Sequence, residues 1–242
     1  MGTTSGPGTL FLVSTPIGNL EDITHRALRI LKEVDLVAAE DTRKTGQLLR
    51  HFGIERPLIS FHSYNESRRV DGIISRLGAG NAVALVTDAG TPGISDPAYS
   101  LVRAAIDAGV PVVPVPGATA FVPALVVSGL PTDRFVFEGF LPAKKGRRKR
   151  LEAIAAERRT VVLYESPHRI ARTVNDLKES CGDRRAVIVR EITKKFEETI
   201  RGTLSELLVI LEHRNLKGEI VVVMEGNGAL NPAGSHAREQ ED

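Results

Sequence analysis

Short apolar runs alternate with amphipathic stretches along the first half of the chain. The apolar runs predict five strands, at 10–14, 36–39, 58–61, 82–87 and 110–115. Between these runs, apolar residues recur at helical spacing over 23–34, 42–52, 67–77 and 98–108. Such alternation of strand and helix predicts an α/β domain with a mostly parallel sheet and helices on both faces.

The pattern restarts after Gly129-Leu130-Pro131, which follows a further apolar helix expected over 118–127. Beyond this point we expect strands at 135–140, 160–164, 186–191 and 219–224. Helices are expected between them, at 148–157, 171–180 and 204–213. These elements predict a second, smaller α/β domain with a mixed sheet.

We therefore place the N-terminal domain at 9–128 and the C-terminal domain at 129–226. Residues 1–8 are rich in glycine, threonine and serine and lack the order of a secretory signal, so they form a flexible N-terminus in this interpretation. Residues 227–242 have no periodic apolar pattern, and we expect a disordered tail there.

Composition agrees with a folded protein of ordinary type. The chain has 242 residues, of which 42% are hydrophobic, and a net charge of +2 that does not by itself indicate nucleic-acid binding. Its one cysteine, Cys181, excludes an intramolecular disulfide and a multi-cysteine zinc site, which agrees with a cytoplasmic location. No apolar run is long enough to cross a bilayer, so we expect no membrane association.

Several common catalytic motifs are absent from the sequence. There is no G-x-G-x-x-G turn after an early strand, no G-x-x-x-x-G-K-[ST] loop, no G-x-S-x-G elbow and no H-E-x-x-H pair. These absences exclude kinase, P-loop, serine-hydrolase and zinc-protease assignments. We expect no metal site.

Two loops that follow predicted strands have a composition typical of ligand-binding loops. Residues 88–97 combine glycine, proline and small polar side chains, which allow close main-chain approach and hold the loop rigid. Residues 116–120 open the next helix with small residues and free N–H groups. Ligands bind at the carboxyl ends of the strands in open α/β sheets, so these loops predict a small-molecule site.

At this point the sequence resembles a known family. The fragments TPIGNLEDIT, AAEDTRKTGQLL, DAGTPGISDP, PGATA, SGLPTDRFVFEGFLP, YESPHR and REITKKFEE occur in the order typical of small-subunit ribosomal RNA cytidine 2′-O-methyltransferases. These enzymes are methyltransferases of the tetrapyrrole-methylase-like, or class III, type. The resemblance covers roughly residues 9–226 and rests on the whole set of fragments.

The resemblance implies a two-domain fold, S-adenosyl-L-methionine bound in the cleft between the domains, and a homodimer. It implies methyl transfer to the ribose 2′-hydroxyl of a cytidine in small-subunit (16S) ribosomal RNA, with that RNA or the 30S subunit as partner. The family often has serine where this chain has Ala118 or Thr119, and we expect binding to survive because all three residues are small.

Carried over from related methylases, ten residues are expected to line the cofactor site: Pro16, Asp88, Gly90, Pro92, Ile94, Asp96, Tyr99, Ala118, Thr119 and Tyr164. Two of them also have simpler interpretations. Asp96 precedes Pro97 at the expected start of a helix and is a natural N-cap. Asp88 is compatible with a solvated turn.

Three carboxylates are candidates for a general base, namely Asp41, Glu40 and Glu165. Asp41 and Glu40 end a predicted strand beside Arg43, and Asp41 is also a natural N-cap for the helix that follows. Spacing does not single out one of the three, and positioning without any base remains an alternative.

Positive charges gather in a basic cluster of six residues, Lys144, Lys145, Arg147, Arg148, Lys149 and Arg150. The cluster predicts contact with RNA phosphates, the alternative being a solvated helix face. Arg43, Arg169 and Lys194 are further RNA-binding candidates at strand ends, although Lys194 is equally compatible with a surface ion pair.

Two other functions fit this pattern less well. A methylase of a tetrapyrrole or other small molecule would share the fold but would not need the basic cluster. A non-catalytic RNA-binding or ribosome-assembly factor would keep the fold without transferring a methyl group.

Overall fold

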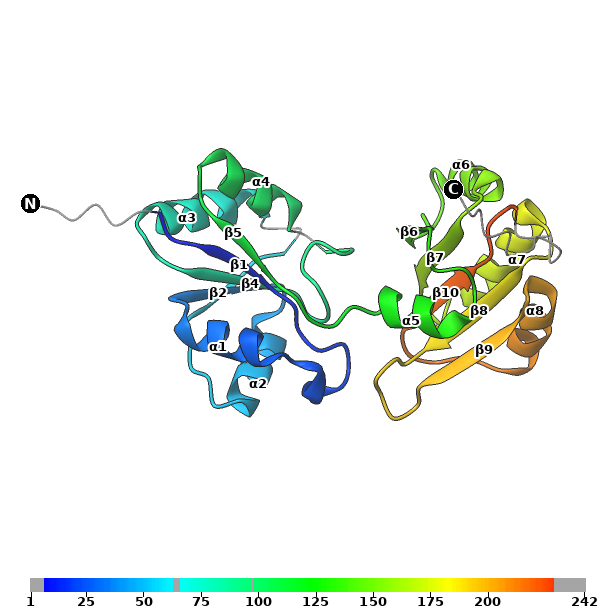
Figure 1. Cartoon of the computed structure of the whole chain (residues 1–242), viewed down its shortest axis with the longest axis horizontal. Coiled ribbons are helices and arrows are strands. Elements are labelled where there is room, and N and C mark those ends of the chain that lie inside the picture. The colour runs from blue at the N-terminus through cyan, green and yellow to red at the C-terminus, as the bar shows by residue number, and fades with distance from the viewer. Residues whose placement is uncertain (1–6, 63–65, 97, 229–242) are drawn as a thin grey trace, which may run out of the picture. The chain divides into compact units, whose positions relative to one another are not determined.

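The computed structural model describes residues 7–62, 66–96 and 98–228 (Figure 1). Contacts divide the chain into two compact units, unit 1 at Met1–Ala120 and unit 2 at Phe121–Asp242. Each unit is built around its own five-stranded sheet, so the expected α/β class with a parallel and a mixed sheet is confirmed.

Unit 1 has a parallel sheet in the order β3-β2-β4-β1-β5. Its strands are β1 (Leu10–Val13), β2 (Leu36–Ala39), β3 (Leu58–Ser60), β4 (Val83–Val86) and β5 (Val112–Val115). Every residue of β2 and β4 is buried, as expected for central strands covered on both faces.

Helices cover both faces of this sheet (Figure 1). They are α1 (His25–Glu33), α2 (Thr42–His51), α3 (Glu66–Gly78) and α4 (Tyr99–Asp107), with a short 3-10 turn at Leu20–Asp22. Residues of α1 and α2 pack with Val37 and Ala39 in one core cluster, whereas residues of α3 and α4 pack with Leu36 and Ala38 in another. Alternate residues of β2 therefore face opposite layers, which makes the unit doubly wound.

Strand β5 forms an open edge of the sheet and contains a proline. The carbonyls of Pro111 and Val115 accept hydrogen bonds from the N–H groups of Leu10 in β1 and of Ser14 just after it, at 2.9 and 3.3 Å. Main-chain groups of alternate residues in a strand point to the same neighbour, so residues 111, 113 and 115 face β1 and the backbone nitrogen of Pro114 faces the open edge. Proline lacks an N–H group and is tolerated at this position.

Unit 2 has a mixed sheet in the order β6-β7-β10-β8-β9. Its strands are β6 (Phe135–Phe140), β7 (Thr160–Glu165), β8 (Arg185–Arg190), β9 (Glu198–Thr203) and β10 (Ile220–Met224). Strand β10 runs antiparallel to both β7 and β8, and β6 runs parallel to β7. The carboxyl ends of β6, β7 and β8 therefore lie at the same edge of the sheet.

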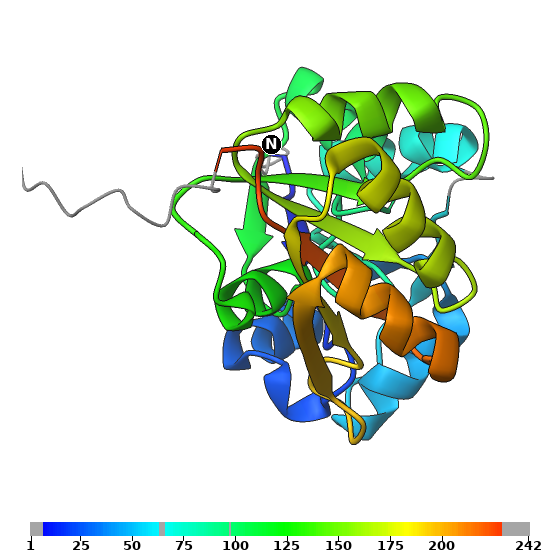
Figure 2. The same cartoon turned by 90° about the vertical axis from the view of Figure 1, so that its right-hand side faces the viewer.

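Helices pack on both faces of this sheet (Figures 1 and 2). Helix α5 (Phe121–Ser128) contacts β7, β8, β9 and β10. Helices α6 (Arg147–Ala156), α7 (Ile170–Cys181) and α8 (Leu204–His213) share a core with Val161, Leu163, Ile188 and Val222.

The domain boundary that we expected at 128/129 is corrected to 120/121, because α5 packs against the sheet of unit 2. The helix expected at 118–127 also begins later, at Phe121. Strand β9 was not predicted at all. The expected flexible N-terminus and disordered tail lie largely outside the described residues.

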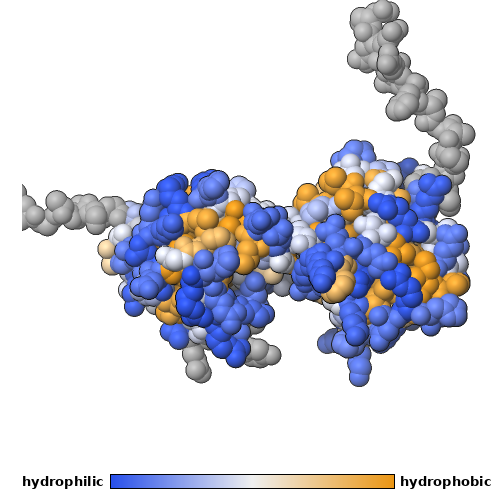
Figure 3. All heavy atoms as spheres, turned by 90° about the horizontal axis from the view of Figure 1, so that it is seen from below, coloured by the Kyte–Doolittle hydropathy of each residue, from blue (hydrophilic) through white to orange (hydrophobic). Residues whose placement is uncertain are grey.

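No helix in the described ranges is both long and apolar enough to cross a membrane. On the face shown in Figure 3, hydrophilic residues of both units are interrupted by apolar patches. Large apolar side chains that are exposed in unit 2 include Val122, Val126 and Val127 of α5.

Candidate active site

Three loops of unit 1 are bonded together where strands β1, β4 and β5 end. Thr15 and Gly90 exchange two main-chain hydrogen bonds, with N···O distances of 2.9 and 3.0 Å. The Ser14 hydroxyl lies 3.0 Å from the Thr91 hydroxyl, which donates to the Ala118 carbonyl at 3.1 Å. Two of the predicted cofactor residues, Gly90 and Ala118, are thus brought together although they lie in separate loops.

The backbone of these loops is tightly constrained. Gly90 and Gly93 have φ angles of 88° and 90°, and Ser95 adopts φ of 68° although it is not a glycine. A Cβ atom at Gly117 would lie 2.8 Å from the Cβ of Ser14, so the loops after β1 and β5 approach closely only because residue 117 is glycine. Constrained backbone of this kind is typical of ligand-binding loops.

Main-chain donors remain open in the loop after β5. The N–H groups of Ala118 and Thr119 have no hydrogen-bond acceptor among the residues that the structure describes. Tyr99, the first residue of α4, is 80% exposed. Unit 1 therefore offers open N–H groups and an exposed aromatic ring for a polar small molecule.

Asp96 does not cap helix α4, which corrects the expected N-cap. The helix begins at Tyr99, and Ala98 occupies the N-cap position without a side-chain hydrogen bond. The Asp96 carboxylate instead accepts the Gly93 N–H at 2.6 Å and closes the loop on itself. Burial raises the pKa of Asp96. Pro97 lies outside the described residues.

Asp88 links the loop after β4 to the start of α2. Its Oδ1 accepts the Asp41 N–H at 2.9 Å, and its Oδ2 lies 2.7 Å from Lys44 Nζ. Both oxygens are thus engaged, which argues against a solvated turn. Asp88 thus joins the loop after β4 to the first turn of α2, and its contact with a cofactor stays a prediction.

Glu40 lies at the end of β2 with one oxygen available. Its Oε2 accepts the Thr87 hydroxyl at 2.8 Å and the Asp88 N–H at 3.3 Å. Its Oε1 has no hydrogen-bond partner within the described ranges. Glu40 also borders a narrow hollow whose other lining residues are Phe61, Leu85, Val86, Thr87, Pro92 and Asp96.

Asp41 is the N-cap of α2, as predicted, and accepts the Arg43 N–H at 2.8 Å. The Arg43 guanidinium also donates to both carboxylate oxygens, at 3.1 and 2.7 Å. Hydrogen bonds from Arg43 hold the pKa of Asp41 well below its usual range. A carboxylate stabilised in this way is a weak proton acceptor.

Glu165, the third candidate base, is buried at the end of β7 and is 2% exposed. Its carboxylate accepts the Ser166 N–H at 2.8 Å and the Thr173 hydroxyl at 2.6 Å, and it pairs with Arg169 at 3.3 Å. Arg169 also donates to the Leu141 carbonyl. Glu165 is thus enclosed by partners within unit 2, whereas the Arg169 side chain is 32% exposed. The roles of Glu165 as a base and of Arg169 as an RNA contact stay predictions.

Tyr164 belongs to an aromatic row on unit 2. Its ring lies 4.9 Å from that of Phe137 and 5.5 Å from that of Phe140, measured between centroids. Phe137 in turn stacks on Phe121 at 4.7 Å. These ring contacts fix the position of the Tyr164 side chain, and the role of Tyr164 in cofactor binding stays a prediction.

Arg147 is 5% exposed, which corrects its assignment as an RNA contact. Its guanidinium pairs with Asp176 at 2.6 Å and donates to the Thr173 hydroxyl at 2.9 Å and the Pro142 carbonyl at 3.1 Å. Each of the three guanidinium nitrogens donates a hydrogen bond to a partner inside unit 2.

The other cations of the basic cluster separate into two groups. Arg148 lies 3.3 Å from Glu152, and Arg150 lies 2.9 Å from Glu138. Lys144, Lys145 and Lys149 are exposed and have no carboxylate within 4.0 Å in the part of the chain that is described. The charge available to a phosphate backbone is carried chiefly by these three lysines.

Lys194 also turns out to be internally paired. Its Nζ lies 2.9 Å from carboxylate oxygens of both Glu191 and Glu219. This confirms the ion-pair alternative and removes Lys194 from the free cations.

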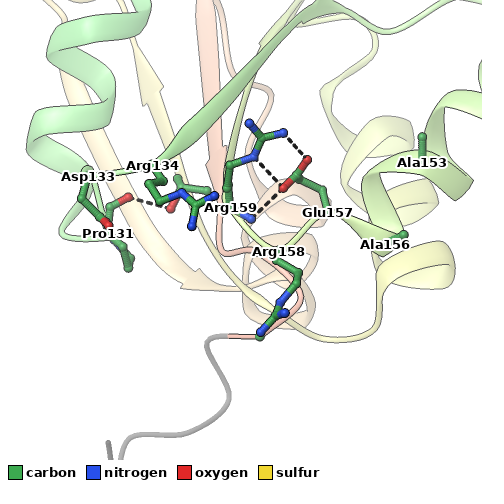
Figure 4. A pocket seen from close by; sticks show the side chains of 11 residues that line it. Pro131, Asp133, Arg134, Ala153, Ala156, Glu157, Arg158 and Arg159 are labelled. Atoms are coloured by element: carbon green, nitrogen blue, oxygen red, sulfur yellow. Dashed lines mark hydrogen bonds and ion pairs between the residues drawn. The ribbon is translucent and has the colours of Figure 1, made fainter. Parts of the chain in front are cut away.

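A pocket of about 670 Å³ opens in unit 2 between the segment before β6 and the end of α6 (Figure 4). Arg159 donates twice to Glu157 there, at 2.9 and 2.8 Å, and these bonds lower the pKa of Glu157 to about 2. None of the predicted site residues lines this pocket. Its walls consist of Pro131, Asp133, Arg134, Ala153, Ala156, Glu157, Arg158, Arg159, Thr160, Gly226 and Gly228.

Among the described residues, no three or more His, Cys, Asp or Glu side chains are grouped so that they could hold a metal ion.

The chain is similar in sequence to curated bacterial proteins over most of its length. The family model of tetrapyrrole (corrin/porphyrin) methylases matches residues 9–208. Ribosomal RNA small subunit methyltransferase I of Xylella fastidiosa is 54% identical over 226 residues, which cover 92% of this chain and 83% of that protein. The protein of the same name from Pseudomonas aeruginosa is 54% identical over 224 residues, covering 90% and 79% of the two chains.

Solved structures share the fold at lower identity. Uroporphyrin-III C-methyl transferase of Thermus thermophilus, solved with S-adenyl homocysteine, matches with a TM-score of 0.62 and 21% identity over 90% of this chain and 97% of that one. The methyltransferase CobJ matches with a TM-score of 0.69 and 21% identity over 94% and 97%.

Proposed function

Because the chain belongs to the ribosomal RNA small subunit methyltransferase I family, within the tetrapyrrole methylases, we propose that it methylates small-subunit ribosomal RNA. The methyl group comes from S-adenosylmethionine, and the acceptor is the ribose 2′-hydroxyl of a cytidine. The observation that carries the proposal is 54% identity over 92% of the chain. The acceptor atom follows from the family resemblance.

The residues of unit 1 fit S-adenosylmethionine. The ligand has a carboxylate and ribose hydroxyls, which match the open N–H groups of Ala118 and Thr119. The left-handed Gly90 and Gly93 allow the main chain to approach it closely. We place the cofactor against the loops after β4 and β5, with Tyr99 beside it.

When bound, the cofactor supplies an electrophilic methyl group on sulfur, and the protein supplies alignment. Orienting the ribose oxygen toward that methyl group accounts for most of the acceleration in this proposal. A proton must also leave the 2′-oxygen. Glu40 is our candidate acceptor, because it keeps one oxygen free, whereas Asp41 is engaged by Arg43 and Glu165 is buried.

Exposed cations of unit 2 give the RNA a place to bind. Lys144, Lys145 and Lys149 form the unpaired part of the basic cluster, and phosphate oxygens are their natural partners. A methylase that acts on a free tetrapyrrole would have no use for this group. If ribosomal RNA is the substrate, the protein acts in the cytoplasm, where small subunits are assembled.

We also propose that the protein is a homodimer, as the family resemblance implies. The exposed Val122, Val126 and Val127 of α5 give a second copy an apolar face to cover. Sedimentation velocity should show a dimer at micromolar concentration, and a monomer there would contradict this part of the proposal.

The decisive experiment measures methyl transfer from labelled S-adenosylmethionine to small subunits prepared from cells that lack this protein. Mass-spectrometric mapping should then find one new 2′-O-methylcytidine. Glu40→Gln should lower the single-turnover rate by about 10²- to 10⁴-fold without changing cofactor affinity. Asp41→Asn, the matched neighbour, should stay close to the wild-type rate.

A wild-type protein that binds RNA but transfers no methyl group would support the assembly-factor alternative instead. Full activity of Glu40→Gln would leave the enzyme assignment intact, and it would mean that water accepts the proton from the 2′-hydroxyl.

A further inference from the structure

The loop of residues 191–197, which joins β8 to β9, is held in one conformation by its own hydrogen bonds. The Glu191 N–H donates to the Glu219 carbonyl at 2.9 Å, and the Lys194 N–H donates to the Glu191 carbonyl at 2.9 Å. The Thr193 N–H donates to a carboxylate oxygen of Glu197 at 2.5 Å. A loop fixed in this way is already organised before any partner binds.

Part of this loop is strained. Glu191 and Thr193 adopt φ of 51° and 69°, which side-chain-bearing residues rarely do, and Thr193 is also β-branched. The Thr193 hydroxyl is buried and has no hydrogen-bond partner in the described part of the chain. Both features cost unit 2 stability, and features of this kind cluster at binding sites.

The strained loop displays an aromatic ring and a cation. Phe196 is 64% exposed, and the Nζ of Lys195 lies 5.6 Å from the centre of its ring. Exposing a large apolar ring is unfavourable, and both neighbours, Lys195 and Glu197, are exposed polar residues. Phe196 is therefore an exposed ring that stands between two exposed polar residues in the chain.

The carboxylates around the loop are all occupied. Glu191 pairs with Lys194, Glu197 accepts the Thr193 N–H, and Glu198 pairs with Arg214 at 2.9 Å. Lys195, in contrast, has no carboxylate within 4.0 Å among the described residues. The ring and a cation free to meet an anion thus lie side by side.

The loop leaves the sheet at the edge that carries Tyr164. Ile220 at the start of β10 pairs with Glu165 on one side and with Arg190 on the other. Strands β7 and β8 therefore end level with each other, and the 191–197 loop begins at the same end of the sheet as the predicted cofactor residue Tyr164, with β10 between them.

We infer that Phe196 and Lys195 form a contact for single-stranded RNA, in which a nucleobase stacks on the ring and an adjacent phosphate meets the ammonium group. This inference rests on the proposed function and deepens it. Single-stranded RNA is recognised by this combination of an exposed aromatic face and a neighbouring cation. Lys195 replaces Lys194 as the RNA contact of this segment.

Fluorescence anisotropy with a short labelled single-stranded RNA, taken from the methylated region, tests the contact. Phe196→Ala should weaken binding by about 5- to 100-fold, the usual effect of losing one stacked base. Phe196→Trp should restore it, because any aromatic face can stack. Lys195→Gln should reduce the slope of log affinity against log salt by about 0.7.

A second arm separates stacking from a structural effect. Abasic sites are scanned through the RNA, and at the stacked nucleotide Phe196→Ala should cause no further loss. Val209→Ala on α8, which removes part of a side chain that is 55% exposed, is the matched control and should bind RNA normally.

Wild-type affinity in Phe196→Ala would overturn the inference, as would a loss that persists at every abasic position. A Phe196→Ala protein that changes its sedimentation from dimer to monomer would instead make the loop a self-association surface. Methyl transfer by the wild-type protein is measured in the same samples. If it is absent, the proposed function fails, and the stacking contact is still decided by the binding data.

Discussion

Arg147 lies at the centre of a buried network that joins α6 to α7 and β7. Its guanidinium donates to the Thr173 hydroxyl, which donates in turn to the Glu165 carboxylate. The Asp176 carboxylate balances the positive charge of Arg147, and the Arg169 guanidinium balances the negative charge of Glu165. Burying an arginine and a glutamate is tolerated here because each polar atom has a partner.

Arg147→Gln should lower the free energy of unfolding by about 2–3 kcal/mol. The reason is that Asp176 loses its ion pair and the Thr173 hydroxyl loses its donor in a largely buried environment. Urea unfolding followed by circular dichroism measures this. Lys149→Gln, two residues away and exposed, should stay within about 0.5 kcal/mol of wild type. Equal stability of the two variants would contradict the network.

The sequence could not distinguish Arg147 from its neighbours. All six cations of the basic cluster look alike in a list of charges, and the partners Thr173 and Asp176 lie on another helix, more than twenty residues away. By contrast, the meeting of the segments that carry Gly90, Ala118 and Glu40 could be predicted, because each follows or ends a strand and strand ends meet at one edge of a parallel sheet. Topology is readable from sequence, whereas side-chain pairing between distant elements is not.

At the scale of elements, strand and helix positions followed the hydrophobic pattern closely, with one omission. Strand β9 has Ile200 as its one apolar residue besides glycine, and it lies at the sheet edge, so its sequence carries little strand pattern. Thr203 ends β9 and begins α8 with a capping box, in which Glu206 returns the hydrogen bond.

The close approach of two loops in unit 1 gives a prediction at this scale. Gly117→Ala should lower the free energy of unfolding by about 1–3 kcal/mol, because its Cβ would lie 2.8 Å from that of Ser14 and one loop must shift. The same shift should raise the dissociation constant for S-adenosylmethionine, as measured by calorimetry.

Gly78→Ala is the matched control for this change. A Cβ atom there meets nothing within 4 Å, and alanine favours helix α3, so stability should rise by up to about 1 kcal/mol. A Gly117→Ala protein as stable as wild type, with unchanged cofactor affinity, would show that the contact between the loops is not needed.

For the whole molecule, the small net charge conceals an uneven distribution. Unit 1 has 11 Lys and Arg residues against 12 Asp and Glu, whereas unit 2 has 21 against 18. The positive excess therefore belongs to unit 2, which also carries the unpaired lysines of the basic cluster. The proposed RNA contacts and the proposed cofactor loops thus fall on different units.

Replacing Lys144, Lys145 and Lys149 together by glutamine should weaken RNA binding and reduce the slope of log affinity against log salt by about 2. Cofactor affinity should not change. The control replaces Arg26, Arg29 and Lys32 of α1, which removes the same charge from unit 1. If both triple variants lower the slope equally, the effect reflects total charge and no local RNA contact.

Pro114 affects how copies of this protein behave at high concentration. An uncovered strand at a sheet edge is a template on which further chains can add strand by strand, the first step toward aggregates. At the β5 edge the position facing outward has no N–H group to offer, so an incoming strand loses a hydrogen bond in the middle of the pairing. Pro114 costs the sheet of unit 1 no hydrogen bond to β1, and it disfavours the addition of a further strand at the β5 edge.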